Sequence, residues 1–152
     1  RRERRWINPL MIIPAQEDIR PPSILSVALT GSEGVVINPA QTRTLSQGRY
    51  TITVEANDTM LRPDEYPLAP HRIVCSVNGT EISALTFETY SARNGELMVY
   101  RNGLIPLREV FAPYPAWQTG EIRLTRGQAT LEIIAQDIAG NSRRAVFRLQ
   151  IE

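Results

Sequence analysis

The side chains with the greatest capacity for chemistry are the single histidine, His71, and the single cysteine, Cys75, which stand four positions apart. A cysteine nucleophile needs a base within hydrogen-bonding reach. The residues from 72 to 77 have the apolar character of a strand, in which positions four apart lie on one face but about 13 Å from each other. We therefore expect no Cys–His dyad, and we expect Cys75 to be a small buried hydrophobic residue.

Other common catalytic patterns are missing from the sequence. A zinc hydrolase takes about three protein ligands, which one histidine and one cysteine cannot supply. The sequence contains neither a Gly-x-Ser-x-Gly nucleophile elbow nor a glycine-rich phosphate loop. A pair of acids that meet in the fold stays open, because spacing along the chain does not exclude it. We predict a non-enzyme, with no catalytic residue and no cofactor of its own.

Acidic and amide side chains in two loops are the candidates for a metal site. Hard oxygen ligands of this kind suit calcium, and the candidate ligands are Asp58, Asp64, Asp137 and Asn141. The alternative, which we favour, is that Asp and Asn are ordinary turn formers whose side chains bond their own backbone. Since no EF-hand spacing is present, we predict no metal site.

An aromatic and proline-rich segment, 111–117, is the candidate for contact with a partner. Flat aromatic faces held by proline in an extended chain could stack on sugars or pack on a protein. The candidate residues for such a surface are Arg101, Phe111, Tyr114 and Trp117. The alternative, which we favour, is that the segment folds back and packs within the chain, where it could cover a sheet edge.

The elements that must position these residues have the period-two pattern of half-buried strands. Alternating apolar and polar residues run along 50–57, 130–136 and 144–151, and the dipeptide Asn78-Gly79 suits the turn of a hairpin. No segment carries a sustained helical stripe with caps. The expected fold is all-β, an immunoglobulin-like antiparallel β-sandwich with two long loops, 57–70 and 101–119.

Proline spacing separates the first part of the chain from the rest. Pro9, Pro14, Pro21 and Pro22 punctuate residues 1–22, which we interpret as a linker and the tail of a preceding domain. Residues 23–152 are then the β-sandwich, a length that suits one domain with a substantial core.

Composition restricts the partners. The formal net charge is +1, which gives no general reason to expect nucleic acid. All 17 basic residues are arginine; anion binding could explain this, but biased codon usage is the explanation we favour. The sequence has neither an apolar stretch long enough to span a membrane nor a signal peptide.

Two short segments resemble known families. The pattern "A-x-D-x-x-G-N" at Ala135 to Asn141 resembles the final hairpin of bacterial extracytoplasmic immunoglobulin-like domains. Residues Arg4 to Leu10 look like the last strand of lysostaphin-type (LytM-like) zinc metallopeptidases, which closes on an "x-x-N-P-L" segment. The zinc ligands of that family have no counterpart here, since His71 matches neither of its histidine motifs. The second resemblance therefore places any zinc in an upstream peptidase domain.

These resemblances imply an extracytoplasmic location, in the periplasm or on the cell surface. The expected function is that of a non-catalytic accessory domain of an envelope protein, which positions or regulates a peptidoglycan-acting peptidase. The implied partners are the preceding domain of the same polypeptide and peptidoglycan or an envelope protein, with no nucleic acid and no membrane span. The alternative is an adhesin or carbohydrate-binding β-sandwich module.

Overall fold

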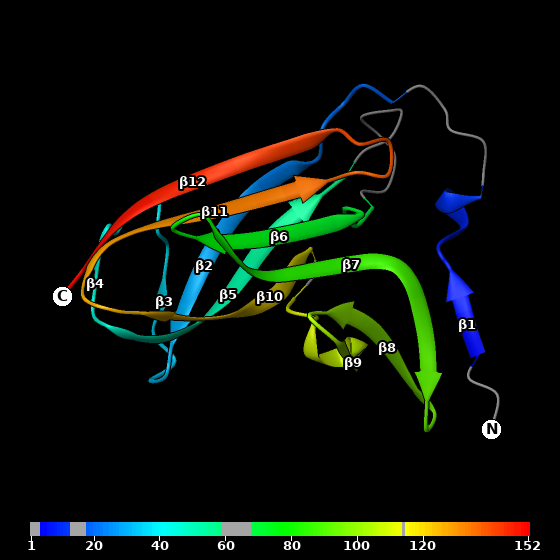
Figure 1. Cartoon of the computed structure of the whole chain (residues 1–152), viewed down its shortest axis with the longest axis horizontal. Coiled ribbons are helices and arrows are strands. Elements are labelled where there is room, and N and C mark those ends of the chain that lie inside the picture. The colour runs from blue at the N-terminus through cyan, green and yellow to red at the C-terminus, as the bar shows by residue number, and fades with distance from the viewer. Residues whose placement is uncertain (1–3, 13–17, 59–67, 114) are drawn as a thin grey trace.

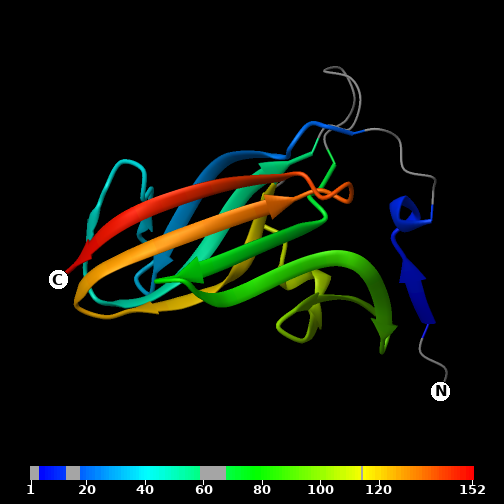
Figure 2. The same cartoon turned by 45° about the horizontal axis from the view of Figure 1, so that its top comes forward.

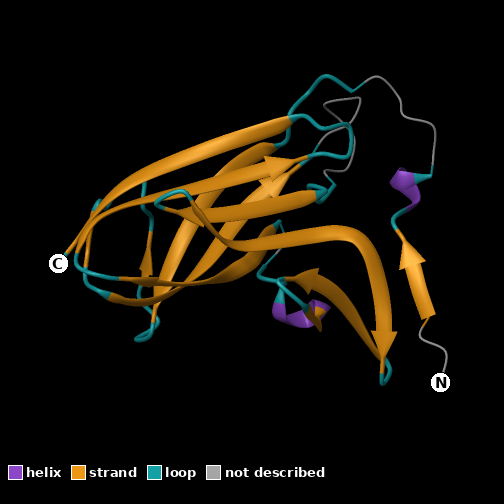
Figure 3. Cartoon of the chain, viewed as in Figure 1, coloured by secondary structure: helices purple, strands orange, loops and turns teal. Residues whose placement is uncertain are grey.

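The computed structural model describes residues 4–12, 18–58, 68–113 and 115–152. Strands account for 66% of the residues and helices for 4%, and two sheets rich in antiparallel pairs pack as a sandwich (Figure 3). The predicted all-β class is therefore confirmed.

The larger sheet includes the N-terminal strand. It also includes the hairpin whose turn carries the candidate metal ligands Asp137 and Asn141. Its pairs are antiparallel except for the parallel pair between its first two members. In spatial order its strands are β4 (Thr44–Leu45), β12 (Ser142–Ile151), β11 (Gly127–Gln136), β6 (Arg72–Val77), β7 (Thr80–Arg93), β8 (Glu96–Arg101) and β9 (Leu104–Pro106), and β1 (Arg4–Ile7) pairs with β7.

The smaller sheet lies behind this layer in Figure 1. Its order is β10 (Ala116–Leu124), β5 (Gly48–Asn57), β2 (Ser23–Gly31) and β3 (Val36–Ile37). Two short 3-10 helices, η1 (Pro9–Met11) and η2 (Leu107–Glu109), complete the elements.

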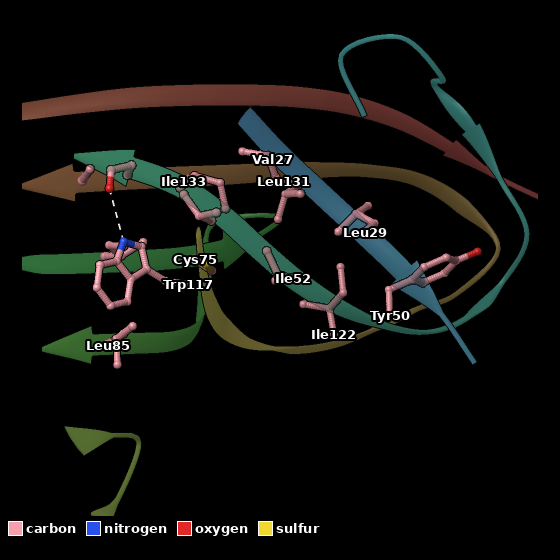
Figure 4. Packing of buried hydrophobic residues seen from close by; sticks show 14 of the residues in the cluster. Val27, Leu29, Tyr50, Ile52, Cys75, Leu85, Trp117, Ile122, Leu131 and Ile133 are labelled. Carbon is pink, nitrogen blue, oxygen red and sulfur yellow. Dashed lines mark hydrogen bonds between the residues drawn. The ribbon is translucent and has the colours of Figure 1, made fainter. Parts of the chain in front are cut away.

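The core lies between the two sheets, and the period-two pattern decides which side chains enter it. Along β5 every second residue from Tyr50 to Ala56 is buried, and β11 repeats this pattern from Ala129 to Ala135. Figure 4 shows side chains from both sheets meeting in one apolar layer. Burial of this kind contributes about 25 cal/mol for each Å² of apolar surface removed from water.

Two tight connections have the predicted form. Asn78 and Gly79 both have positive φ angles, 50° and 79°, as the turn between β6 and β7 requires. The backbone of Asn78 also donates to the carbonyl of Thr130 in β11, at 2.9 Å. The second hairpin joins β11 to β12 through residues 137–141.

Strand β7 is long and belongs to two regions of the sheet. Its first part pairs with β6 inside the sandwich, and its last part pairs with β1 and β8 beyond it. The register between β7 and β8 shifts between Thr86 and Ser91, and there the strand bends away from the sandwich (Figures 1 and 2). We call β1, residues 87–93 of β7, β8 and β9 the arm.

The two predicted loops differ in outcome. Most of 101–119 has regular structure, since it contains β9, η2 and the start of β10. The predicted long loop therefore contains short regular elements, and Pro106 is both the last residue of β9 and the N-cap of η2. In 57–70, Asp58 and Leu68 exchange backbone hydrogen bonds of 2.8 Å, and residues 59–67 lie outside the described part.

Candidate functional site

Three carboxylates from distant parts of the sequence meet at one end of the sandwich. Carboxylate oxygens of Asp18, Asp58 and Asp137 lie within 4.8 Å of one another. Asp58 and Asp137 are 5% and 2% exposed. Burial of charged groups is costly unless they are paired or hydrogen bonded, so the surroundings of each carboxylate determine what the cluster can do.

Asp137 is held by its own turn. One of its carboxylate oxygens accepts from the backbone N–H of Asn141 and the other from the Asn141 side-chain amide, each at 2.8 Å. The same amide also donates to the carbonyl of Asp18, at 2.8 Å. Asp137 therefore has the turn-forming role described above, and Asn141 joins the segment before β2 to the turn between β11 and β12.

Carboxylate and carbonyl oxygens are the ligands that calcium prefers, and Asp18, Asp58 and Asp137 could hold such an ion. Asp64 lies outside the described residues. Asp18 was not among the sequence candidates, because it belongs to a segment in which no element was expected. Its own side chain accepts from the backbone of Arg20 at 2.9 Å, an Asx turn that the local sequence could have indicated.

The aromatic candidates pack within the chain. Trp117 is 4% exposed, and its indole N–H donates to the carbonyl of Ala56 at 3.2 Å (Figure 4). Its ring lies edge-on to Phe87, with centroids 5.0 Å apart, and tilted against Phe111 at 5.3 Å. The indole therefore has no face left for a ligand, whereas Phe111 is 47% exposed.

Arg101 also has an internal role. Its guanidinium donates to the carbonyl of Gln118 at 3.0 Å and thereby joins β8 to β10. Tyr114 lies outside the described residues. The four candidates for a ligand surface thus include one core residue and one residue that bridges the two sheets.

His71 and Cys75 contact different residues. The Nε2 atom of His71 lies 3.1 Å from a carboxylate oxygen of Glu88. The Cys75 thiol donates to the hydroxyl of Thr119 at 3.1 Å, and burial raises the pKa of this thiol above its usual value. Cys75 is therefore a protonated core residue at neutral pH, since a nucleophilic cysteine needs a lowered pKa and exposure.

The arm exposes several large apolar side chains. Trp6 and Ile7 of β1 are both exposed, as are the three apolar residues Leu97, Tyr100 and Leu104 of β8 and β9. Large apolar side chains left exposed in this way are a common mark of an interaction site. None of these five residues was a sequence candidate, because residues 1–22 were expected to be a linker and the tail of a preceding domain.

These features define a β-sandwich protein with an extended arm. A family model matches residues 21–152, and the chain belongs to that uncharacterised family. No curated protein and no solved structure matches the chain. In the described part of the chain, no helix is long and apolar enough to cross a bilayer.

Proposed function

We propose that this chain is a non-catalytic accessory domain of a bacterial cell-envelope protein. It positions or regulates the domain that precedes it, a lysostaphin-type peptidase that acts on peptidoglycan. The arm is the part of the molecule that makes contact with that domain.

The strand arrangement supports an immunoglobulin-like module. In that fold, strands A, B and E lie in one sheet, and strands C, F and G lie in the other. In chain order, β2, β5 and β10 correspond to A, B and E, while β6, β11 and β12 correspond to C, F and G. The "A-x-D-x-x-G-N" turn then joins the last two strands, as it does in the domains that it resembles.

The observation that carries the proposal is the pairing of β1. Arg4 to Ile7, which look like the end of a peptidase domain, add to β7 with Trp6 opposite Tyr90. Asn8 then joins the chain to the bend of β7. Its backbone N–H donates to the backbone carbonyl of Glu88 at 2.9 Å, and its side-chain amide donates to the backbone carbonyl of Phe87 at 3.1 Å. A domain that ends in β1 would be attached to the sandwich through the pairing of β1 with β7, a strand of the larger sheet.

The apolar surface of the arm supports the same role. Exposed apolar side chains commonly mark an interaction site, and Trp6 and Ile7 lie beside the point where a preceding domain would join. The alternative role as a carbohydrate-binding module loses support at Trp117 and Arg101, because both are engaged inside the chain.

The first experiment concerns the gene. We expect a His-x-His motif in the encoded sequence shortly upstream of Arg1, and a parent protein without one would contradict the peptidase neighbour. Analysis of the purified 152-residue chain for zinc is expected to find no stoichiometric zinc. A bound zinc ion would contradict the non-catalytic role of this chain.

The second experiment measures hydrolysis of purified sacculi by the parent protein. Asn8→Ala removes the side-chain contact of β1 with the bend of β7, and we expect slower hydrolysis. The matched control is Asn38→Ala, which removes a turn-forming amide far from the arm. The side-chain oxygen of Asn38 accepts from the backbone N–H of Ala40 at 2.9 Å. Equal rates for the two variants would contradict a positioning role for the arm.

A further inference from the structure

Strand β4 and the C-terminal end of β12 meet at the end of the sandwich opposite the arm (Figure 1). Residues of β12 and of the loop before β4 line two surface pockets. The first, of about 450 Å³, is lined by Pro39, Ala40, Arg43, Val146, Phe147 and Arg148. The second, of about 560 Å³, is lined mainly by Arg43, Gln128, Thr130, Arg148 and Gln150. Arg43 and Arg148 border both pockets, and we call this region the Arg43–Arg148 surface.

The backbone on both sides of this surface is fixed. Arg148 lies opposite Thr130 in the pairing of β12 with β11, and Gln150 lies opposite Gln128. The carbonyl of Arg43 accepts from the backbone of Gln150 at 2.7 Å, which ties the loop before β4 to β12. Because the backbone is already held in this way, the entropy lost on binding is mainly that of the side chains.

The two arginines differ from Arg144 and Arg72 of the same sheet, which lie beside carboxylates. Arg144, on the same strand, donates to Glu132 at 2.6 Å, and Arg72 lies 3.6 Å from Glu81. Within the described residues, neither Arg43 nor Arg148 forms an ion pair with a carboxylate. Both side chains are exposed, so two guanidinium groups face solvent without an acidic partner in that part of the chain.

The chemistry of the lining favours one class of ligand. Guanidinium groups match carboxylates in a planar, two-point geometry. The amides of Gln128 and Gln150 and the hydroxyl of Thr130 can both donate to and accept from sugar hydroxyls. Ala40 and Val146 supply apolar contacts for the C–H faces of a sugar ring. Single-stranded nucleic acid fits less well, because binding it takes exposed aromatic platforms and a strongly basic groove.

We propose that the Arg43–Arg148 surface binds an acidic polysaccharide chain, with carboxylates against the two guanidinium groups. The binding surface lies at the end of the molecule away from β1. It does not depend on the role proposed for the arm.

The test measures the affinity of the full 152-residue chain for polygalacturonate by affinity electrophoresis. The double variant Arg43→Gln/Arg148→Gln is expected to bind about tenfold more weakly or worse, because two charge-assisted contacts are lost. The matched control, Arg144→Gln, removes one charge from the same strand and should bind nearly as well as the wild type. Unchanged thermal melting of each variant excludes loss of fold as the cause.

Three results would overturn the proposal. An equal loss in the Arg144→Gln control would show that net charge alone drives retention. Equal binding of neutral dextran would remove the role of the carboxylates. Equal binding of polyglutamate would show that the surface selects acidic polymers in general and not polysaccharides.

Discussion

Trp117 joins the two sheets at the centre of the molecule. It lies on β10, opposite Val54 of β5, and its ring packs across the sandwich against Phe87 of β7. Its N–H is satisfied by the carbonyl of Ala56. A buried aromatic side chain with a satisfied polar atom contributes both apolar burial and orientation.

We predict that Trp117→Ala lowers the free energy of unfolding by about 3–5 kcal/mol, because the lost ring leaves a cavity between the sheets. Urea unfolding measures the change. Phe111→Ala is the control, since the exposed ring of Phe111 should cost much less. Equal losses for the two variants would contradict the central position of Trp117.

Gly120 allows β10 to approach β7 closely. A Cβ atom added there would lie 2.7 Å from the Oγ atom of Ser83 and 2.8 Å from its Cβ atom. We predict that Gly120→Ala costs about 1–3 kcal/mol of stability through this overlap. Adding Ser83→Gly should recover part of the loss, as a thermal melting series would measure. Additive destabilisation by the two changes would rule out the contact as the cause.

Cys75 predicts a dependence of stability on pH. Burial raises the pKa of its thiol in the folded state above the ordinary value of 9.0. The folded chain therefore retains a proton that the unfolded chain releases. The stabilisation from this group is complete below the unfolded pKa and is lost as pH rises through the folded pKa.

We expect the unfolding free energy of the wild type to fall more steeply above about pH 9 than that of Cys75→Ala. Guanidinium unfolding at a series of pH values gives both slopes. Tyr90, whose pKa is also raised by burial, is present in both proteins and cancels in the difference. Parallel slopes would mean that the thiol ionises normally in the folded state.

At the scale of elements, β1 pairs with β7, and the hydrogen bonds of Asn8 add to that attachment. All four β1 residues are exposed, so its apolar burial is small and its hydrogen bonds carry most of the attachment. We predict that Asn8→Ala speeds amide exchange of residues 4–12 by about tenfold. Mass spectrometry of the N-terminal peptide measures this, with Asn38→Ala as the control. An unchanged rate would show that Asn8 does not hold the strand.

Local patterns were sufficient to predict the hairpins. Period-two alternation and the Asn78-Gly79 dipeptide predicted β6, β7, β11 and β12, because both signals act within a few residues. The bend of β7 has no such signal, since Phe87 to Tyr90 continue a strand-like sequence. It results from pairing with β1 and β8, which are separate in the chain.

The same reason limited prediction of the candidate site. Asp137 and Asn141 lie in one turn, and their relation could be read from the sequence. Asp18 and Asp58 reach that turn only through the packing of the two sheets. The chemistry of Trp117 alone fits either a ligand-binding surface or the core. Its position opposite Val54 in the pairing of β10 with β5 assigns it to the core.

At the scale of the whole molecule, the sandwich and the arm contribute unequally to stability. The family match begins at residue 21, and the core residues that pack between the sheets come from β2 onward. We predict that deletion of residues 1–12 leaves a cooperatively unfolding β-sandwich that is less destabilised than Trp117→Ala. Circular dichroism during urea unfolding tests this. A chain left unfolded by the deletion would place β1 among the elements essential for folding.

The continuous backbone of β7 also determines how the molecule would carry a mechanical load. A force on the chain ahead of Arg4, directed along the arm, pulls β1 lengthwise past β7, so its four paired residues resist together rather than one after another. The force is then transmitted to the sandwich along the covalent backbone of β7. Because β7 is one continuous strand, no loop within it can extend under the force. A force applied at the N-terminal end would therefore act directly on the hydrogen bonds between β7 and β6.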